Sequence, residues 1–293
     1  MYSIDKLYES VAQKGPVCVG LDTAPEYLPP DLPATPAGIW RYNQAIIDAT
    51  WEAAPCFKVQ IAYYEALGIP GLEVYAKTLR YIRQKGGLVI GDIKRGDIAD
   101  TARKYAEAHF AGEFEADFVT LSPYMGLDSL EPWLDYAERF GKGAFVLLRT
   151  SNKGMRDFQY LELKSGGRLY HAVLTKLSDL AKHRPGACGY GIFGAVAGCT
   201  DQEDSANLRQ TGDKLFFLIP GYGAQGGEAA AAATLLKNGN GGVVNASRSI
   251  LRAWQTEANP PGRPTTAFAA EAARRATLAL REDLRAPGLN RRA

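Results

Sequence analysis

Eight short apolar segments, each followed by a segment interpreted as a helix, constrain the fold of this chain most strongly. They are rich in valine, isoleucine, leucine and phenylalanine with little alternation, which is typical of parallel strands buried on both faces. Eight such units within 293 residues predict a (β/α)8 barrel, with an open doubly wound sheet as the alternative. The predicted strands are Val17–Asp22, Cys56–Gln60, Leu88–Lys94, Ala116–Leu121, Gly143–Leu148, Gly189–Ala197, Leu215–Ile219 and Gly241–Asn245.

The segments around these strands predict helices, and two of the connections predict loops: a proline-rich one over residues 25–36 and a long polar one over residues 150–165. No linker or shift in composition divides the chain. We therefore expect one domain over residues 1–293, with a frayed tail after about residue 284. The predicted helices are Tyr2–Lys14, Ala37–Ala53, Leu72–Lys85, a helix capped by Asp97 or Asp100 and ending at Phe110, Ser129–Phe140, Arg168–His183, Asp201–Gln210, Glu228–Asn238 and Thr266–Leu280.

The bulk composition is that of an ordinary globular protein, with 46% hydrophobic and 23% charged residues. A net charge of +2 gives no field that favours nucleic acid or a membrane surface. The longest apolar run, 229–236, is too short to span a bilayer, and residues 1–5 lack the pattern of a signal peptide. The four cysteines form no C-x-x-C motif and are interpreted as reduced thiols, so we expect a cytoplasmic protein.

The third predicted strand ends in a dense group of charges, Asp92, Lys94 and Asp97. Side chains alternate faces along a strand, so Asp92 and Lys94 should point the same way, with Asp97 just beyond. Each charge favours ionisation of its neighbours. An isolated D-x-K pair is usually a structural ion pair, but the third charge and the position at a strand end favour a catalytic array.

Polar residues also follow the other strands, at the carboxyl ends where a (β/α)8 barrel places its active site. Asp22 ends the first strand, and Lys58 lies in the second. Residues 150–152 follow the fifth strand, residues 220–227 the seventh and residues 245–249 the eighth. A purely structural role does not explain why so many strand ends carry charged or polar groups.

The loop after the seventh strand matches G-x-G-x-x-G at Gly221, Gly223 and Gly226. A dinucleotide fingerprint normally opens its domain and is followed by an acid at the end of the next strand. Here Ser247 and Arg248 stand near that end. A barrel phosphate site, with glycine amides and the Arg248 guanidinium as donors, fits better. A tight turn beside a surface arginine remains the alternative.

The histidines argue against a metal site or a histidine-activated nucleophile. His109, His171 and His183 fall in predicted helices without ligand spacing, and we interpret them as surface residues. None lies at a strand end, so no Ser–His or Cys–His pair is favoured.

Residues 92–101, which read Asp-Ile-Lys-Arg-Gly-Asp-Ile-Ala-Asp-Thr, resemble the D-x-K-x-x-D-I-x-x-T signature of the orotidine 5′-phosphate decarboxylase family. Other blocks match in the same order, at residues 20–22, 57–58, 219–227 and 247–249, so the resemblance spans nearly the whole barrel. The chain is similar to the longer bacterial branch of this family. It departs from shorter members at Ser247, where glycine is usual, and in the long loop after the fifth strand.

The resemblance implies decarboxylation of orotidine 5′-monophosphate to uridine 5′-monophosphate, without a metal or cofactor. It implies that Lys94 stabilises and protonates the carbanion left at C6. Asp92 and Lys58 would hold Lys94 charged and, with Asp22, contact the ribose. Asp97 would face the departing carboxylate.

The resemblance also implies the substrate-binding residues. Ser151 or Asn152 is the candidate for the pyrimidine edge. Asp97 and Thr101 would reach into the site of a neighbouring subunit, which predicts a homodimer with shared active sites. Ile98 is a further candidate for binding the substrate. The candidates near the phosphate are Pro220, Gln225, Ser247 and Arg248.

Three other functions remain open from the residues alone. A related barrel decarboxylase or aldolase acting on a sugar phosphate would need carboxylates arranged for Mg²⁺. A Schiff-base aldolase would use a lysine such as Lys94 as nucleophile. A non-catalytic barrel that binds nucleotide phosphate would have no need of the charged array.

Overall fold

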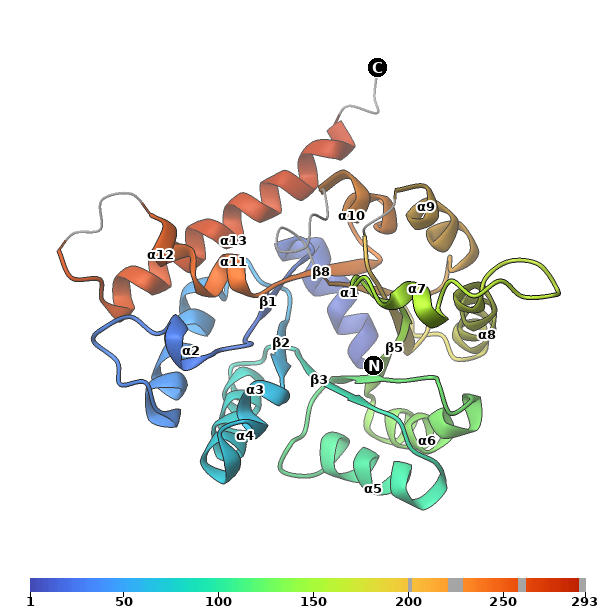
Figure 1. The fold of residues 1–293 in the computed structure, drawn as a ribbon, viewed down its shortest axis with the longest axis horizontal. Helices are drawn as coiled ribbons and strands as arrows, with labels where there is room; N and C mark the ends of the chain where they lie inside the picture. Colours follow the sequence, from blue (N-terminus) through green and yellow to red (C-terminus); the bar gives the residue numbers. More distant parts are fainter. Residues whose placement is uncertain (200–201, 221–228, 258–261, 290–293) are drawn as a thin grey trace.

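The computed structural model describes residues 1–199, 202–220, 229–257 and 262–289 of the chain. Its strands form one closed parallel barrel in which each strand pairs with the next in sequence and β8 pairs with β1. Figure 1 shows the strands at the centre with the helices around them. The barrel predicted from the sequence is confirmed, and the open doubly wound sheet is excluded. The strands are β1 (Val17–Gly20), β2 (Phe57–Gln60), β3 (Val89–Arg95), β4 (Phe118–Leu121), β5 (Gly143–Arg149), β6 (Phe193–Ala197), β7 (Phe217–Ile219) and β8 (Gly242–Ala246).

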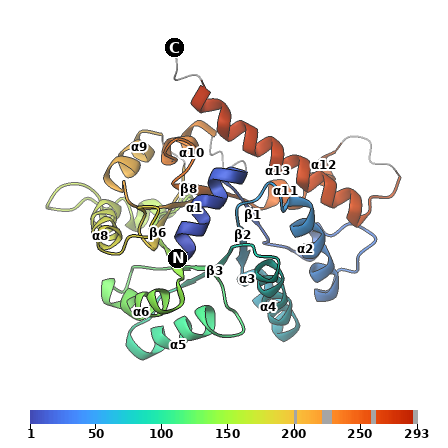
Figure 2. The same ribbon diagram turned by 180° about the vertical axis from the view of Figure 1, so that it is seen from behind.

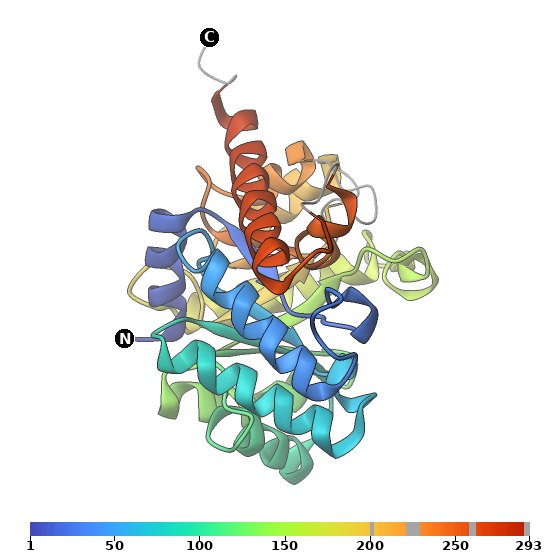
Figure 3. The same cartoon turned by 90° about the vertical axis from the view of Figure 1, so that its left-hand side faces the viewer.

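Helices follow the strands as predicted, with short extra turns in several connections. The long helices are α1 (Ser3–Lys14), α2 (Pro36–Thr50), α4 (Gly68–Gln84), α5 (Ala99–Phe110), α6 (Glu131–Phe140), α8 (Leu169–His183), α9 (Gln202–Thr211), α10 (Ala229–Leu235) and α13 (Thr266–Leu289). The short ones are η1 (Pro25–Tyr27), α3 (Ala62–Glu65), η2 (Leu127–Leu130), α7 (Met155–Phe158), α11 (Arg248–Leu251) and α12 (Ala253–Thr256). The last helix, α13, packs along α2 and α10 (Figure 3).

Helix α1 lies across the amino-terminal end of the barrel (Figure 2). Its residues bond to the loops that precede four strands. The Tyr8 carbonyl accepts from Asn240, the Ser10 hydroxyl donates to the Pro55 carbonyl, and Asp5 accepts from the Cys188 amide. The Ser3 amide donates to Gly141. Because α1 covers this end, the carboxyl ends of the strands form the open face.

Two expectations about α5 were wrong. The helix begins at Ala99 with Ile98 as its N-cap, and no side chain caps it, so neither Asp97 nor Asp100 has the predicted role. His109 is not a surface residue: it is 2% exposed and stacks on Phe114 and Trp133. Burial and the charge of Arg95 lower the pKa of His109 to about 4. The helical spacing did not show which face of α5 would pack inward.

Other boundaries differ by a few residues. The sixth strand begins at Phe193, because Gly189 adopts a positive φ and the segment before the strand forms a small bridge between Pro185 and Gly191. The loop over residues 150–165 contains the single turn α7. Helix α13 continues to Leu289, past the predicted end near residue 280.

Candidate active site

Four charged side chains alternate in sign at the carboxyl ends of β1, β2 and β3. Lys58 Nζ lies 3.1 Å from Asp22 Oδ1 and 2.9 Å from Asp92 Oδ2. Lys94 Nζ lies 2.5 Å from the second oxygen, Asp92 Oδ1. The parallel register sets these contacts, because Gln60 pairs with Asp92 and Gly20 with Lys58. As strand alternation predicted, Asp92 and Lys94 point the same way.

Burial divides the array into a fixed part and an accessible part. Lys58 and Asp92 are each 5% exposed, whereas the Lys94 side chain is 46% exposed. Burial alone would raise the pKa of Asp92, but Lys58 and Lys94 outweigh it and hold that pKa well below its usual range. Burial opposes the charge on Lys58, yet Asp22 and Asp92 raise its pKa well above the ordinary value. Lys58 and Asp92 are therefore both charged at neutral pH, and Lys94 is the ammonium group open to a ligand.

The backbone that carries Lys94 departs from regular strand geometry. The register between β3 and β4 shifts between Gly91 and Arg95, and Lys94 has a φ of +45°. The Thr120 hydroxyl on β4 accepts from the amides of Ile93 and Lys94. It also donates to Asp92 Oδ1 over 2.8 Å. Thr120 was not among the residues predicted from the sequence, where its only signal is a hydroxyl within an apolar strand.

Asp97 does not join this array within its own chain. It is half-buried, its Oδ1 accepts from the Ile98 amide over 2.8 Å, and it forms no ion pair with the described residues. Ile98 is 48% exposed, and Thr101 is exposed on the first turn of α5. None of these three residues is fully buried within the chain.

The segment after β5 is held by its own hydrogen bonds. The Thr150 hydroxyl donates to Asn152 Oδ1 over 2.6 Å, and Gln159 bonds both the amide and the hydroxyl of Thr150. Ser151 is half-buried, with its Cα and Cβ close to Gly198 after β6. Of the two pyrimidine candidates, Asn152 thus has its oxygen engaged within the loop.

A buried arginine just before this loop connects it to helix α9. Arg149, the last residue of β5, is fully buried and lies 3.2 Å from Asp204 Oδ2 on α9. The Tyr160 hydroxyl donates to the same oxygen over 3.0 Å. Through Asp204, Tyr160 therefore links the far end of the loop to Arg149, the residue just before the loop begins.

The loop after β8 lies directly against β1. A Cβ on Gly20 would stand 1.9 Å from Ser247 Oγ and 3.0 Å from Asn245 Oδ1, so glycine is required for this contact. Asn245 Nδ2 donates to Ser247 Oγ over 3.3 Å. Arg248, exposed at the start of α11, follows at once.

Arg248 and Asp22 share one neighbourhood at the barrel mouth. Burial and Asp22 raise the pKa of Tyr63, while the charge of Arg248 opposes this rise, so both charges act on one hydroxyl. Pro220 is half-buried at the end of β7. Gln225 and the glycines of the loop after β7 lie outside the described residues.

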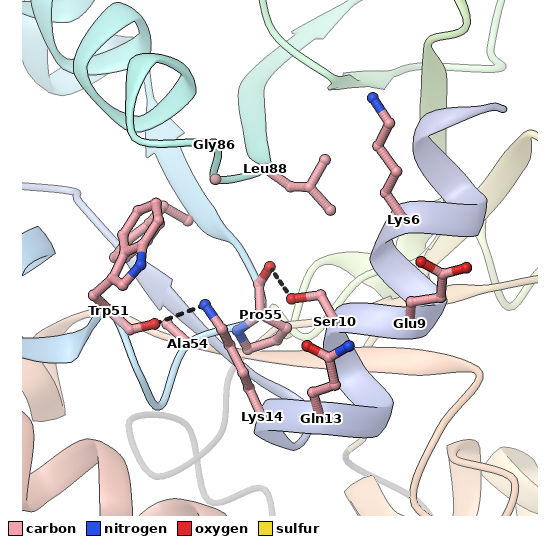
Figure 4. A pocket seen from close by; sticks show the side chains of 12 residues that line it. Lys6, Glu9, Ser10, Gln13, Lys14, Trp51, Ala54, Pro55, Gly86 and Leu88 are labelled. Atoms are coloured by element: carbon pink, nitrogen blue, oxygen red, sulfur yellow. Dashed lines mark hydrogen bonds between the residues drawn. The ribbon is translucent and has the colours of Figure 1, made fainter.

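The cavity in Figure 4 is a separate feature at the amino-terminal end of the barrel. It has a volume of about 220 Å³ and lies between α1 and the loops before β2 and β3. Lys14 donates to the Trp51 carbonyl and Ser10 to the Pro55 carbonyl, so these groups are engaged by the backbone. Nothing in this cavity belongs to the charged array.

Neither a metal centre nor a membrane segment is found in the part of the chain that the structure describes. No three His, Cys, Asp or Glu side chains within the described ranges are grouped to hold a metal ion. None of the described helices combines the length and apolar character that crossing a bilayer requires.

A closed (β/α)8 barrel with alternating lysines and carboxylates at the carboxyl ends of its strands is the arrangement of a barrel enzyme. Residues 15–259 match the model of the family described as orotidine 5′-phosphate decarboxylase / HUMPS. The chain belongs to this family, which confirms the resemblance seen in the sequence.

Similar proteins agree over nearly the whole length. A relative from Clostridium kluyveri, named orotidine 5′-phosphate decarboxylase, is 55% identical over 87% of this chain and 89% of its own. One of the same name from Clostridium perfringens is 50% identical over 96% of this chain and 97% of its own. The solved structure of Leishmania donovani OMP decarboxylase is 33% identical, with a TM-score of 0.74 over 96% of this chain and 99% of that one.

Proposed function

We propose that this chain decarboxylates orotidine 5′-monophosphate to uridine 5′-monophosphate, the last step of de novo pyrimidine nucleotide synthesis. The observation that carries the proposal is the alternating array of Asp22, Lys58, Asp92 and Lys94 at the barrel mouth of a member of this family. Relatives at 50–55% identity carry the name of that activity.

The array supplies what the reaction needs. Breaking the bond between C6 and the carboxyl group leaves an electron pair on C6 with no adjacent carbonyl to accept it. The Lys94 ammonium stabilises this pair and then delivers a proton to C6, giving UMP and CO₂. Asp92 holds that ammonium in place, and Lys58 neutralises the other oxygen of Asp92. Fixed charges placed before the reaction cost no reorganisation during it.

The rest of the barrel mouth binds the substrate. Ser151 or Asn152 contacts the pyrimidine, and Asp22 the ribose. The phosphate lies beside Ser247 and Arg248 after β8 and beside Pro220 at the end of the neighbouring strand β7. Gln225 remains a candidate for the same phosphate from the sequence. Arg248 is exposed and next to the close contact between β8 and β1, which suits a bidentate grip on an anion.

The functional unit is a homodimer with shared sites. Ile98 and Thr101 are exposed and Asp97 is only half-buried, so a second copy can reach them. Exposed apolar side chains near the same end, at Ile98, Tyr124, Met125 and Leu127, supply a surface that association would cover. In this arrangement Asp97 meets the substrate carboxylate bound in the partner. The four thiols are free and three are buried, which is compatible with a cytoplasmic location.

The deciding experiment is a spectrophotometric assay with orotidine 5′-monophosphate, comparing the wild-type protein with Lys94→Ala. We expect turnover that survives excess EDTA in the wild type and none above background in Lys94→Ala, because the proton donor is gone. UMP should still bind the variant, since the phosphate and pyrimidine contacts remain. Lys104→Ala, which removes an exposed lysine of α5, is the matched control. An inactive wild type, an active Lys94→Ala or a borohydride-trapped imine would refute the proposal.

A further inference from the structure

We infer that Thr120 on β4 is a positioning residue for the array: its single hydroxyl fixes both the Asp92 carboxylate and the backbone from which Lys94 projects. The inference rests on the proposed role of Lys94. It assigns Thr120 no contact with the substrate. Its effect is transmitted through the two residues that it holds.

The hydrogen bonds of Thr120 use the full capacity of a hydroxyl group. Its hydrogen goes to Asp92 Oδ1 over 2.8 Å. Its lone pairs accept from the Ile93 amide at 3.0 Å and the Lys94 amide at 2.9 Å. A hydroxyl has one donor and two acceptor positions, so nothing is left over. Thr120 is 1% exposed, and water cannot replace these bonds without entering the core.

The two backbone bonds lie where the sheet itself is interrupted. The register of β3 against β4 is regular at Gly91, and the next paired residue is Arg95. Lys94, within the gap, adopts a φ of +45°, a region that residues other than glycine seldom occupy. Such a backbone persists only where its surroundings determine it. The Thr120 oxygen takes both amides at this point and so holds Lys94 in a conformation that aims its side chain at Asp92.

The hydrogen bond from Thr120 to Asp92 acts on the other member of the ion pair between Asp92 and Lys94. Thr120 and Lys94 share one oxygen of Asp92, Oδ1, while Lys58 occupies the other. With Thr120 in place, the carboxylate is bonded on three sides and cannot rotate. Without the hydroxyl, the Lys94 backbone and the carboxylate that orients its ammonium would both be released. The groups proposed to bind phosphate and pyrimidine lie on other strands and would not move.

The test is a kinetic comparison of Thr120→Val with Thr120→Ser. Valine keeps the shape and removes the hydroxyl, whereas serine keeps the hydroxyl. We expect kcat to fall by about 10²-fold in Thr120→Val with KM changed less than about threefold, as for a small misplacement of a reacting group. Thr120→Ser should recover most of the loss. Thr277→Val on α13 is the matched control, because that buried hydroxyl donates to the Ala273 carbonyl of its own helix.

The outcomes separate this inference from the proposed function. Near-normal kcat in Thr120→Val, a change in KM alone, or a Thr120→Ser defect as large as that of valine would overturn it. If Thr120→Val does not fold, Thr120→Cys, with its weaker donor and acceptor, should show the same selective loss of kcat. Lys94→Ala is measured in parallel: an active Lys94→Ala refutes the proposed site itself. An inactive Lys94→Ala beside a normal Thr120→Val refutes only the role of Thr120.

Discussion

At the scale of the residue, burial separates two charges of the array, Lys58 and Asp92, from Lys94, the lysine proposed to react. Lys58 and Asp92 are buried and ion-paired, and removing one partner of a buried pair typically costs about 3–5 kcal/mol because the other charge is stranded. A loss of activity in a Lys58 variant would therefore mix catalysis with folding. Lys94 is half exposed, so its removal tests the chemistry with little effect on stability.

His109 supplies a second residue-level prediction, on stability against pH. Its folded pKa of about 4 lies below the ordinary value of 6.5, so the unfolded chain binds the proton more readily. The neutral His109 ring makes its full contribution to the free energy of unfolding above pH 6.5, and this contribution is lost as the pH falls towards 4. Up to about 3 kcal/mol of the free energy of unfolding depends on this one ring. Urea unfolding at pH 7.0 and 4.5 should show a smaller acid loss in His109→Phe than in wild type.

The exposed His183→Phe is the matched control, and it should keep the wild-type pH dependence. Equal acid losses in His109→Phe and wild type would show that the buried ring does not titrate as described.

At the scale of the element, the sequence predicted the positions of side chains within one strand but not the contacts between neighbouring elements. The eight apolar runs specified the barrel, and strand alternation brought Asp92 and Lys94 to one side. The role of Thr120 depends on the register shift between β3 and β4, which no single run encodes. The burial of His109 depends likewise on how α5 packs against α6, where Trp133 lies.

The contact between β1 and the loop after β8 leads to a prediction about phosphate binding. In Gly20→Ala, the new Cβ overlaps Ser247 Oγ and pushes that loop, with Arg248, outward. We expect a rise of about tenfold or more in KM and in the Kd for UMP, which corresponds to the loss of about 1.4 kcal/mol of binding free energy. Adding Ser247→Gly should restore most of the affinity, because it removes the overlapping atoms.

Gly86→Ala controls for general strain, because Gly86 has a positive φ but an added Cβ there would meet no other atom. This variant should leave KM unchanged. If Gly20→Ala binds UMP normally, or if adding Ser247→Gly restores none of the lost affinity, the loop after β8 does not determine how tightly the phosphate is bound.

At the scale of the whole molecule, the proposed homodimer makes each active site depend on Lys94 from one chain and Asp97 from the other. Lys94→Ala and Asp97→Ala homodimers should both be nearly inactive. Dissociating and mixing them makes half of the dimers hybrid, and each hybrid has one doubly defective and one intact site. Activity should rise to about a quarter of the wild-type value, with wild-type KM. If Asp97 acts within its own chain, hybrids confirmed by mass spectrometry would remain inactive.

The position of α1 has a consequence for the order in which the molecule can assemble. This helix is synthesised before every strand of the barrel, yet its bonds reach Gly141, Cys188 and Asn240, and β1 beside it pairs with β8. On the ribosome, the residues of α1 and β1 must wait until nearly the whole barrel has emerged before their partners are present. Such distant pairing slows folding and leaves apolar surface and a strand edge uncovered meanwhile. We therefore expect α1 and β1 to be open to aggregation in the nascent chain until β8 has emerged from the ribosome.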